Sequence, residues 1–247
     1  MRRKFFAGAL ASALMLGGAL AAFAQEPANS TVNADFRPGS AKAGTKKTPR
    51  ANSVNLILKG GTKDGMGQPA TSTSLNVTLP KQWRINSEDW PRKQRCDIVK
   101  ANQARSDSVC PKGSKIGSGK SIAKAGGGGI TQNLTVTAFV IKNGDLGFFL
   151  RGTTPVTVAE MIQGVTSKRR QLNVKIPSNL QEPVDSVTTG ITLLQTKLGG
   201  TARINGKRRG LLETTGCGTR NRWLFTFKNV YRGGGSNSDS DTPKCRK

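Results

Sequence analysis

The chain has 247 residues and is strongly basic, with 39 Lys and Arg against 14 Asp and Glu and a formal net charge of +25. It contains no histidine, the usual general base near neutral pH and the commonest zinc ligand, which excludes Ser-His and Cys-His hydrolases and His-containing zinc sites. Hydrophobic residues make up 35% of the chain and aromatic residues only 5%, with 30 glycines. We therefore expect a β-rich domain with a core of mainly Val, Ile and Leu.

The first 24 residues have the layout of a secretory signal peptide. Three basic residues at 2–4 precede an uncharged apolar run over 5–20, and the small-residue pattern at 22–24 offers a cleavage point. We predict that residues 1–24 are a signal peptide and that the mature protein is secreted or otherwise extracytoplasmic, with association with the cell wall as one option. No second apolar stretch is long enough for a transmembrane segment.

Composition divides the rest of the chain into three parts. Residues 25–50 are small and polar, which predicts a flexible N-terminal segment, and residues 233–247 form a polar C-terminal tail rich in Gly, Ser and Asp. Residues 51–232 contain short β-type runs separated by Gly, Pro and Asn. This pattern predicts one all-β domain, an antiparallel β-sandwich of the immunoglobulin-like or jelly-roll-like kind.

The β-type runs follow one another along this domain. A long polar stretch over 81–115 interrupts them and predicts a loop with a helical turn near 97–104. The firmest hairpin joins 130–142 to 146–150 through Asn143-Gly144, a dipeptide suited to positive φ angles. The remaining expected strands are 54–58, 75–79, 156–165, 172–176, 187–198 and 223–231.

Aromatic residues mark the last of these strands. Trp223, Phe225, Phe227 and Tyr231 share one parity, so they face one side of a sheet. We interpret them as an inward core stripe, and an exposed platform for stacking sugars is the alternative.

The four cysteines lie beyond the expected leader and include no C-x-x-C pair, which disfavours a zinc site and favours disulfides. Three pairings are possible. We favour Cys96–Cys110 and Cys217–Cys245, because each would close a short polar loop; the first would staple the long loop of the domain.

Two cationic triplets are the most distinctive charged features: Lys168-Arg169-Arg170 and Lys207-Arg208-Arg209. Each lies between strand-like runs, and loop tips with three cations can bind phosphate or carboxylate polymers. Ordinary solubilising loops are the alternative. In a plain up-and-down meander an odd number of strands separates the two loops, so a single patch would require a crossover. Specific nucleic-acid binding is not expected, because the usual aromatic-plus-basic strings are absent.

Two motifs imitate enzyme signatures. Residues 114–121 resemble a phosphate-binding loop, but Ser114 stands where glycine is required and four consecutive glycines follow instead of a helix. Ser121-Ile122-Ala123-Lys124 matches the S-x-x-K pattern of serine acyltransferases, whose companion motifs are missing. Both segments are better explained as a β-strand entered through a Gly/Ser turn.

Two groups of acidic residues imitate other sites. Asn237, Asp239 and Asp241 alternate as in the first half of a calcium loop, but they lack its glycine and its distal glutamate, so we expect a solvated tail and no metal site. A histidine-free hydrolase would need Glu88 or Asp89 to converge with Glu160 or Glu213 across a cleft. No catalytic residue and no cofactor is predicted.

One resemblance covers roughly 53–231. The succession of Leu79-Pro80, a polar stretch to Cys96, the segment Cys110-Pro111-Lys112-Gly113-Ser114-Lys115-Ile116-Gly117-Ser118-Gly119, and Thr215-Gly216-Cys217 resembles a group of uncharacterised secreted β-rich proteins of high-GC Gram-positive bacteria. The resemblance implies export and a β-rich fold, and it implies no catalytic residue.

These observations favour a secreted, non-catalytic envelope or extracellular protein that associates with anionic cell-wall or extracellular polymers through its basic surface. The alternatives are a carbohydrate- or lipid-binding β-sandwich module, which would expose aromatic residues or open a cavity between sheets, and a histidine-free hydrolase.

Overall fold

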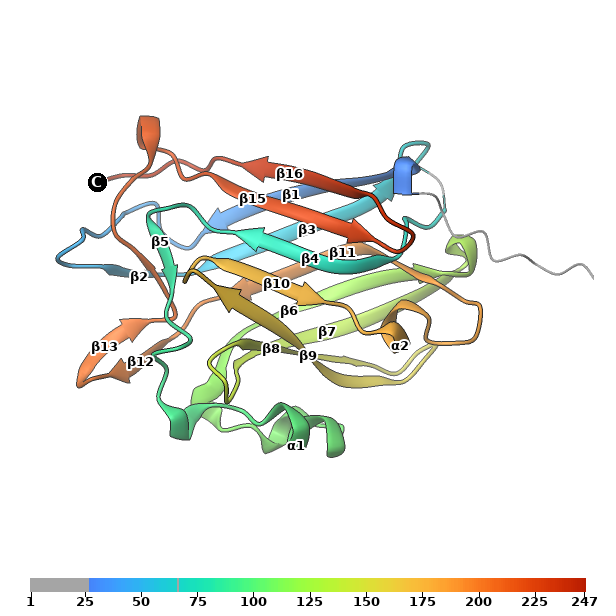
Figure 1. Cartoon of the computed structure of the whole chain (residues 1–247), viewed down its shortest axis with the longest axis horizontal. Helices are drawn as coiled ribbons and strands as arrows, with labels where there is room; N and C mark the ends of the chain where they lie inside the picture. Colours follow the sequence, from blue (N-terminus) through green and yellow to red (C-terminus); the bar gives the residue numbers. More distant parts are fainter. Residues whose placement is uncertain (1–26, 66) are drawn as a thin grey trace, which may run out of the picture.

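The computed structural model describes residues 27–65 and 67–247, so the expected signal peptide at 1–24 lies outside the described residues. One large sheet dominates them, and all of its strand pairs are antiparallel (Figure 1). In spatial order its strands are β1 (Ser30–Pro38), β3 (Val54–Thr62), β11 (Thr189–Leu198), β6 (Lys115–Ala125), β7 (Ile130–Val140), β8 (Leu146–Gly152), β9 (Val158–Ser167), β10 (Gln171–Lys175), β4 (Ser72–Thr78), β15 (Phe225–Tyr231) and β16 (Ser236–Asp241). The all-β, antiparallel class expected from the sequence is confirmed.

The sheet curls into a nearly closed barrel, where the sequence pattern suggested two layers of sheet. Its edge strands β1 and β16 lie side by side, and side chains of β16 close the seam by hydrogen-bonding to the backbone of β1. The bonds join the Asn237 amide to the Ser30 carbonyl, Asp239 to the Ala34 N–H, and Asp241 to the Phe36 N–H. This seam satisfies backbone groups that an open edge would leave exposed.

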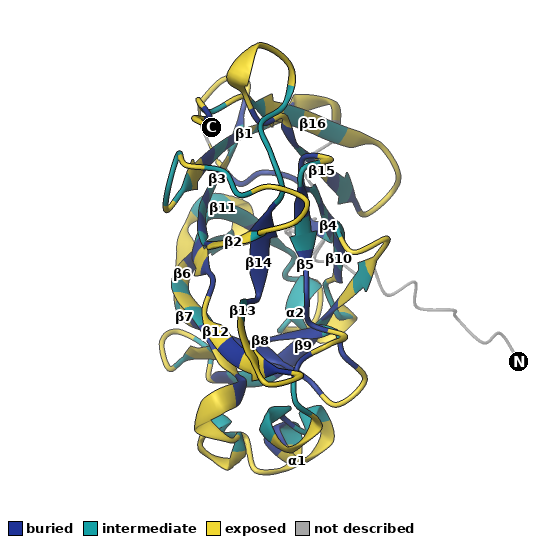
Figure 2. Cartoon of the chain, turned by 90° about the vertical axis from the view of Figure 1, so that its left-hand side faces the viewer, coloured by how far each residue is buried: buried dark blue, intermediate teal, exposed yellow. Residues whose placement is uncertain are grey.

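Two small sheets lie at one end of the barrel (Figure 2). Buried side chains of these strands include Trp83, Ile85, Ala202, Ile204 and Leu212. One sheet contains β2 (Arg50–Asn52), β14 (Leu212–Thr214) and β5 (Trp83–Ile85), and the other contains β12 (Thr201–Ile204) and β13 (Lys207–Gly210). Asn205 and Gly206 both have positive φ at the β12–β13 turn, as the Asn-Gly pair predicts.

The barrel interior is the hydrophobic core. Phe36 stacks on Phe225 with ring centroids 4.8 Å apart, and Trp83 meets Trp223 edge-on at 5.1 Å. The predicted aromatic stripe is therefore an inward core stripe, with Trp223, Phe225, Phe227 and Tyr231 all buried.

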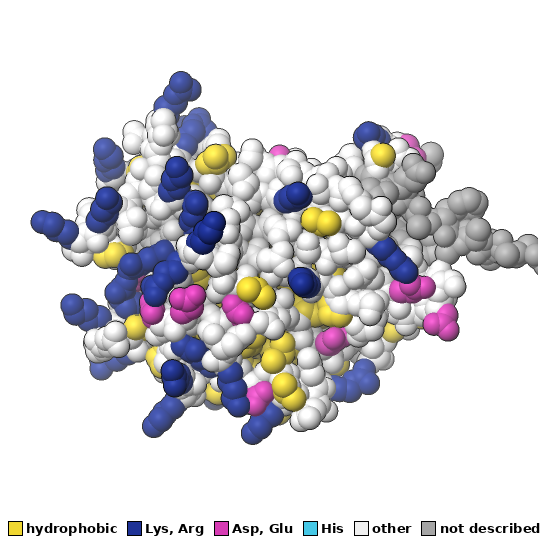
Figure 3. Space-filling view, in the orientation of Figure 1, with side chains coloured by type: hydrophobic (Ala, Val, Ile, Leu, Met, Phe, Trp, Pro, Cys, Tyr) yellow, Lys and Arg dark blue, Asp and Glu magenta, His cyan; other side chains and the backbone are white. Residues whose placement is uncertain are grey.

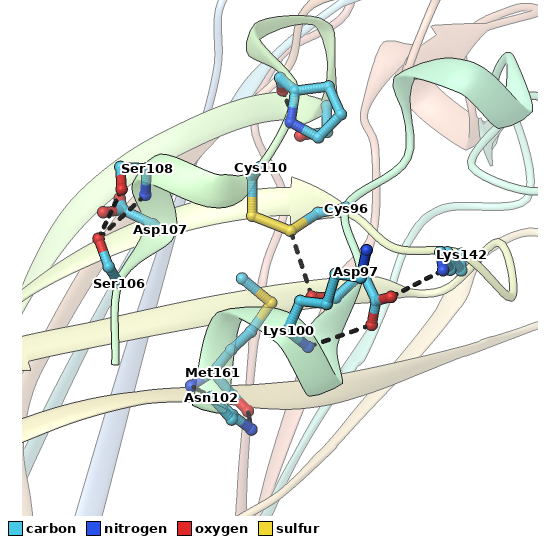
Figure 4. The surroundings of a disulfide bond; sticks show 12 residues. Cys96, Asp97, Lys100, Asn102, Ser106, Asp107, Ser108, Cys110, Lys142 and Met161 are labelled. Carbon is cyan, nitrogen blue, oxygen red and sulfur yellow. Dashed lines mark hydrogen bonds and ion pairs between the residues drawn. A yellow bond between two sulfur atoms is a disulfide. The ribbon is translucent and has the colours of Figure 1, made fainter. Parts of the chain in front are cut away.

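The long loop packs on the outside of the barrel beneath β9 (Figure 4). It contains helix α1 (Ile98–Gln103), whose N-terminal amides are capped by Asp97. The hydrogen bond from Lys142, together with a backbone N–H of the helix, holds the pKa of Asp97 below its usual value. Asn102 accepts from the Met161 N–H at 2.6 Å and donates to its carbonyl, which fixes the helix to the barrel wall.

Both predicted disulfides are present, Cys96–Cys110 in this loop and Cys217–Cys245 near the C-terminus. The second helix is α2 (Ser178–Gln181), and within the described ranges no helix has the length and apolar character to span a membrane. Short 3-10 turns cover Pro27–Asn29, Arg92–Gln94, Asp107–Val109, Lys112–Ser114, Gly126–Gly128 and Thr219–Asn221.

Two parts of the expected division of the chain are corrected. Residues 25–50 were expected to be flexible, but they contain β1 and begin β2, and Ala34 and Phe36 of β1 are buried in the core. Residues 233–247 were expected to be a polar tail, but they contain β16, and Cys245 is bonded to Cys217. The barrel thus extends beyond the predicted 51–232 at both sides.

Candidate anion-binding site

The two predicted cationic triplets lie at the same end of the barrel. Lys168-Arg169-Arg170 forms the turn between β9 and β10, and Lys207-Arg208-Arg209 lies in β13. Residues 85–86 lie between the two triplets and bond to both segments. The Ile85 N–H donates to the Arg169 carbonyl at 2.6 Å, and the Asn86 N–H donates at 2.8 Å to the carbonyl of Leu211, which directly follows β13. Figure 3 shows Lys and Arg side chains concentrated at this end.

The meander argument, which places the triplets at opposite ends, is therefore wrong for this chain. After β10 the chain crosses the barrel to insert β11 between β3 and β6, instead of pairing it with β10. β12 and β13 then leave the main sheet as a separate hairpin at the end where β11 finishes. Because β12 is not a strand of the barrel, only β10 and β11 separate the two triplets, and this even number of strands places both at one end.

Two of the six predicted contact residues are already paired with carboxylates. Arg169 Nη1 and Nη2 donate to the Asp89 carboxylate at 2.7 and 3.2 Å. Arg209 donates to Glu213 at 2.7 Å through both Nε and Nη2, and Glu213 is 2% exposed. Arg84 donates to the same buried carboxylate. Arg84 and Arg209 join strands of the two small sheets through Glu213, and Arg169 joins the β9–β10 turn to the loop after β5. Arg169 and Arg209 are therefore less available to an external anion.

The other four predicted residues are available. Among the described residues no carboxylate forms an ion pair with Lys168, Arg170, Lys207 or Arg208. Arg208 Nε donates only to the Thr201 hydroxyl, at 3.2 Å. The free charge of the triplets therefore lies on these four side chains.

Arg170 also lines a groove of 510 Å³ on the outside of this end of the barrel. Three further cations line it: Lys81 after β4, and Arg220 and Arg222 before β15. No Asp or Glu is among its lining residues, and within the described chain none of the four cations forms an ion pair. Four positive charges around a concave surface without a carboxylate make this groove a candidate anion-binding site.

The arginine-bearing loop over 216–224 has a fixed shape. Arg220 and Asn221 have positive φ angles of 54° and 55°, and the Asn221 carbonyl accepts from the Cys245 N–H at 2.8 Å. At Gly218 a Cβ would lie 2.2 Å from the Arg222 carbonyl oxygen, so only glycine fits. The Cys217–Cys245 disulfide and these contacts fix the backbone that carries Arg220 and Arg222.

Sequence reasoning missed Lys81, Arg220 and Arg222. Clustering was the signal used, and none of these residues lies in a run of cations. The only available hint was the Gly216-Cys217-Gly218 segment next to two arginines, which suggests a stapled loop that presents charge.

The motifs that imitate enzymes have structural roles. Residues 115–125 form strand β6, and the Ser121 hydroxyl donates to the Leu193 carbonyl at 3.1 Å. Glu213 binds two arginines, Asp89 binds Arg169, and Glu160 accepts from Asn179. In the part of the chain that the structure describes, no three metal-binding side chains form a group that could hold an ion.

Comparisons with protein-family models, curated proteins and solved structures found no match.

Proposed function

We propose that this chain is an exported, non-catalytic protein that holds anionic polymers of the cell wall or the extracellular space at the basic end of its barrel. The groove lined by Lys81, Arg170, Arg220 and Arg222 is the main contact, and the free cations of the triplets extend it. The observation that carries the proposal is the convergence of these four cations, from three separate segments, around a concavity without an acid.

The chemistry of the groove suits a phosphate- or carboxylate-bearing chain. Arginine presents a planar fork of N–H donors that can bind two oxygens of such a group. Water and salt ions screen charges in a partly enclosed groove less than charges on an open surface. A polymer that carries one anion per repeat engages several cations at once, which raises affinity beyond that of any single contact. The two disulfides are compatible with an oxidising compartment outside the cytoplasm.

Binding to purified cell walls that carry phosphate polymers tests the proposal. A groove variant would combine Lys81→Gln, Arg170→Gln and Arg220→Gln. A control would combine Lys59→Gln, Lys63→Gln and Lys175→Gln, which remove the same charge from exposed positions away from this end. At about 150 mM salt we expect the groove variant to lose roughly tenfold in affinity or more, about 1.4 kcal/mol, and the control to lose less than about threefold.

Walls from which the phosphate polymers have been extracted complete the experiment, and they should retain little protein. Retention that does not change between about 50 and 500 mM salt would reject a Coulombic mechanism. Equal losses in the two triple variants would assign the attraction to the overall charge and remove the groove from the proposal.

The two other hypotheses receive less support. The aromatic stripe is buried, so within residues 27–65 and 67–247 it offers no exposed row of rings on which sugars could stack. The acidic residues that a hydrolase would need are paired with arginines or with Asn179.

A further inference from the structure

The interior of the barrel contains two adjacent cavities, of 90 and 80 Å³. Their walls share Ser121, Leu150, Ile176 and Ile191, so the cavities follow one another inside the same lumen. Together they are of the same order as the ~150 Å³ apolar cavity that admits benzene in an engineered protein. Their end-to-end arrangement suits a narrow, elongated molecule better than a round one.

The first of these cavities, here called the outer cavity, lies next to the surface. Val156, Leu180 and Pro183 line it, and the same residues also line a 410 Å³ groove outside the barrel. These side chains belong to the loop before β9 and to the region of α2. They separate the lumen from solvent by one layer of side chains, so a small movement of this loop or of α2 would admit a ligand.

No charged side chain lines either cavity, so an ion would enter without a partner. Two hydroxyls on the lining have no hydrogen-bond partner within the described residues: Ser72 Oγ on the outer cavity and Thr196 Oγ1 on the inner one. The two residues are 3% and 4% exposed. A buried hydroxyl without a partner destabilises a protein, which makes these two groups candidates for contacts with a ligand oxygen.

We propose that the lumen binds an uncharged, elongated apolar molecule that carries an oxygen, of the class of a medium-chain alcohol or ketone. The hydrocarbon chain fills the two cavities, and its oxygen bonds to the hydroxyl of Thr196 or Ser72. This inference does not depend on the anion-binding groove.

Calorimetric titration with octan-1-ol tests the proposal, with octanoate at pH 8 as a charged molecule of the same length. We expect a dissociation constant of roughly 10–100 μM for the alcohol and at least about tenfold weaker binding of octanoate. Ala123→Phe places a ring in the outer cavity and should weaken alcohol binding at least tenfold. Ile122→Phe adds the same ring one residue earlier, on the outward face of β6, and should leave binding unchanged.

Thr196→Val keeps the shape of the side chain and removes its hydroxyl. It should weaken binding of the alcohol roughly three- to tenfold without lowering the melting temperature of the free protein. If Ala123→Phe does not fold, Ala125→Leu on the same cavity replaces it. Alcohol binding that is equal in wild type and in a folded cavity-filling variant would overturn the proposal, and so would the absence of alcohol binding to the wild type, which would leave a lumen that holds water at most.

Discussion

The hydrogen bond from β1 to Asp239 of β16 allows us to predict how much stability the seam between these strands contributes. Its Oδ2 accepts from the Ala34 N–H at 2.7 Å, and Ala34 is 5% exposed. Truncation of the side chain in Asp239→Ala leaves this buried N–H without its acceptor. A buried donor left unsatisfied costs about 1–3 kcal/mol, and the loss of a bond to a charged acceptor lies in the upper part of that range. We expect the free energy of unfolding to fall by about 2 kcal/mol.

Urea unfolding followed by tryptophan fluorescence measures this loss, since Trp83, Trp90 and Trp223 are all buried in the native state. Asp239→Asn retains an oxygen acceptor and should lose less than half as much. Ser238→Ala changes an exposed side chain of the same strand and should stay within about 0.5 kcal/mol of wild type. The seam would play no part in stability if Asp239→Ala were indistinguishable from Ser238→Ala.

Two further predictions concern other buried groups. Glu213→Ala leaves Arg84 and Arg209 without their shared carboxylate and the buried Gly210 N–H without its acceptor. The two arginines are 30% and 32% exposed and can turn to water, so we expect the free energy of unfolding to fall by about 2–3 kcal/mol in the same urea assay; a loss below about 0.5 kcal/mol would contradict the structural role of this network. Burial raises the pKa of Tyr231, so the stability that its neutral phenol contributes is complete below the unfolded pKa of about 10 and is lost as pH rises through the folded pKa. Tyr231→Phe should therefore flatten the fall in melting temperature above about pH 10, and identical alkaline profiles for the two proteins would refute the assignment.

The parts of the fold that local pattern could predict are those whose own residues carry apolar alternation. The aromatic strand β15 and the hairpin at Asn143-Gly144 were found in this way, because their side chains and turn residues define the structure locally. β1 and β16 were missed. β1 buries few large apolar side chains, and β16 has the sequence Ser-Asn-Ser-Asp-Ser-Asp, which contains none. These strands form because neighbouring strands offer backbone hydrogen bonds. The sequence pattern of a single segment does not show which strands will lie beside it.

The candidate site was partly predictable for a related reason. A run of cations along the chain is visible in the sequence, and it identified Arg170 in the groove. The same signal also selected Arg169 and Arg209, which pair with carboxylates: Asp89, 80 residues away along the chain, and Glu213, four residues after Arg209. Sequence clustering therefore measures local charge density, whereas binding depends on which charges the fold leaves unpaired.

Strand β4 runs from one proposed site to the other. Its first residue, Ser72, lines the outer cavity of the lumen, and its last residue, Thr78, lines the basic groove. The sites therefore lie at opposite ends of one barrel wall, and the aromatic core around Phe225 packs between β1, β15 and β5 near the groove end. Because that core is close-packed, a molecule in the lumen has no open route to the groove. Polymer binding and binding of a small apolar molecule should then be independent, so octan-1-ol at saturation should leave the affinity for cell walls unchanged.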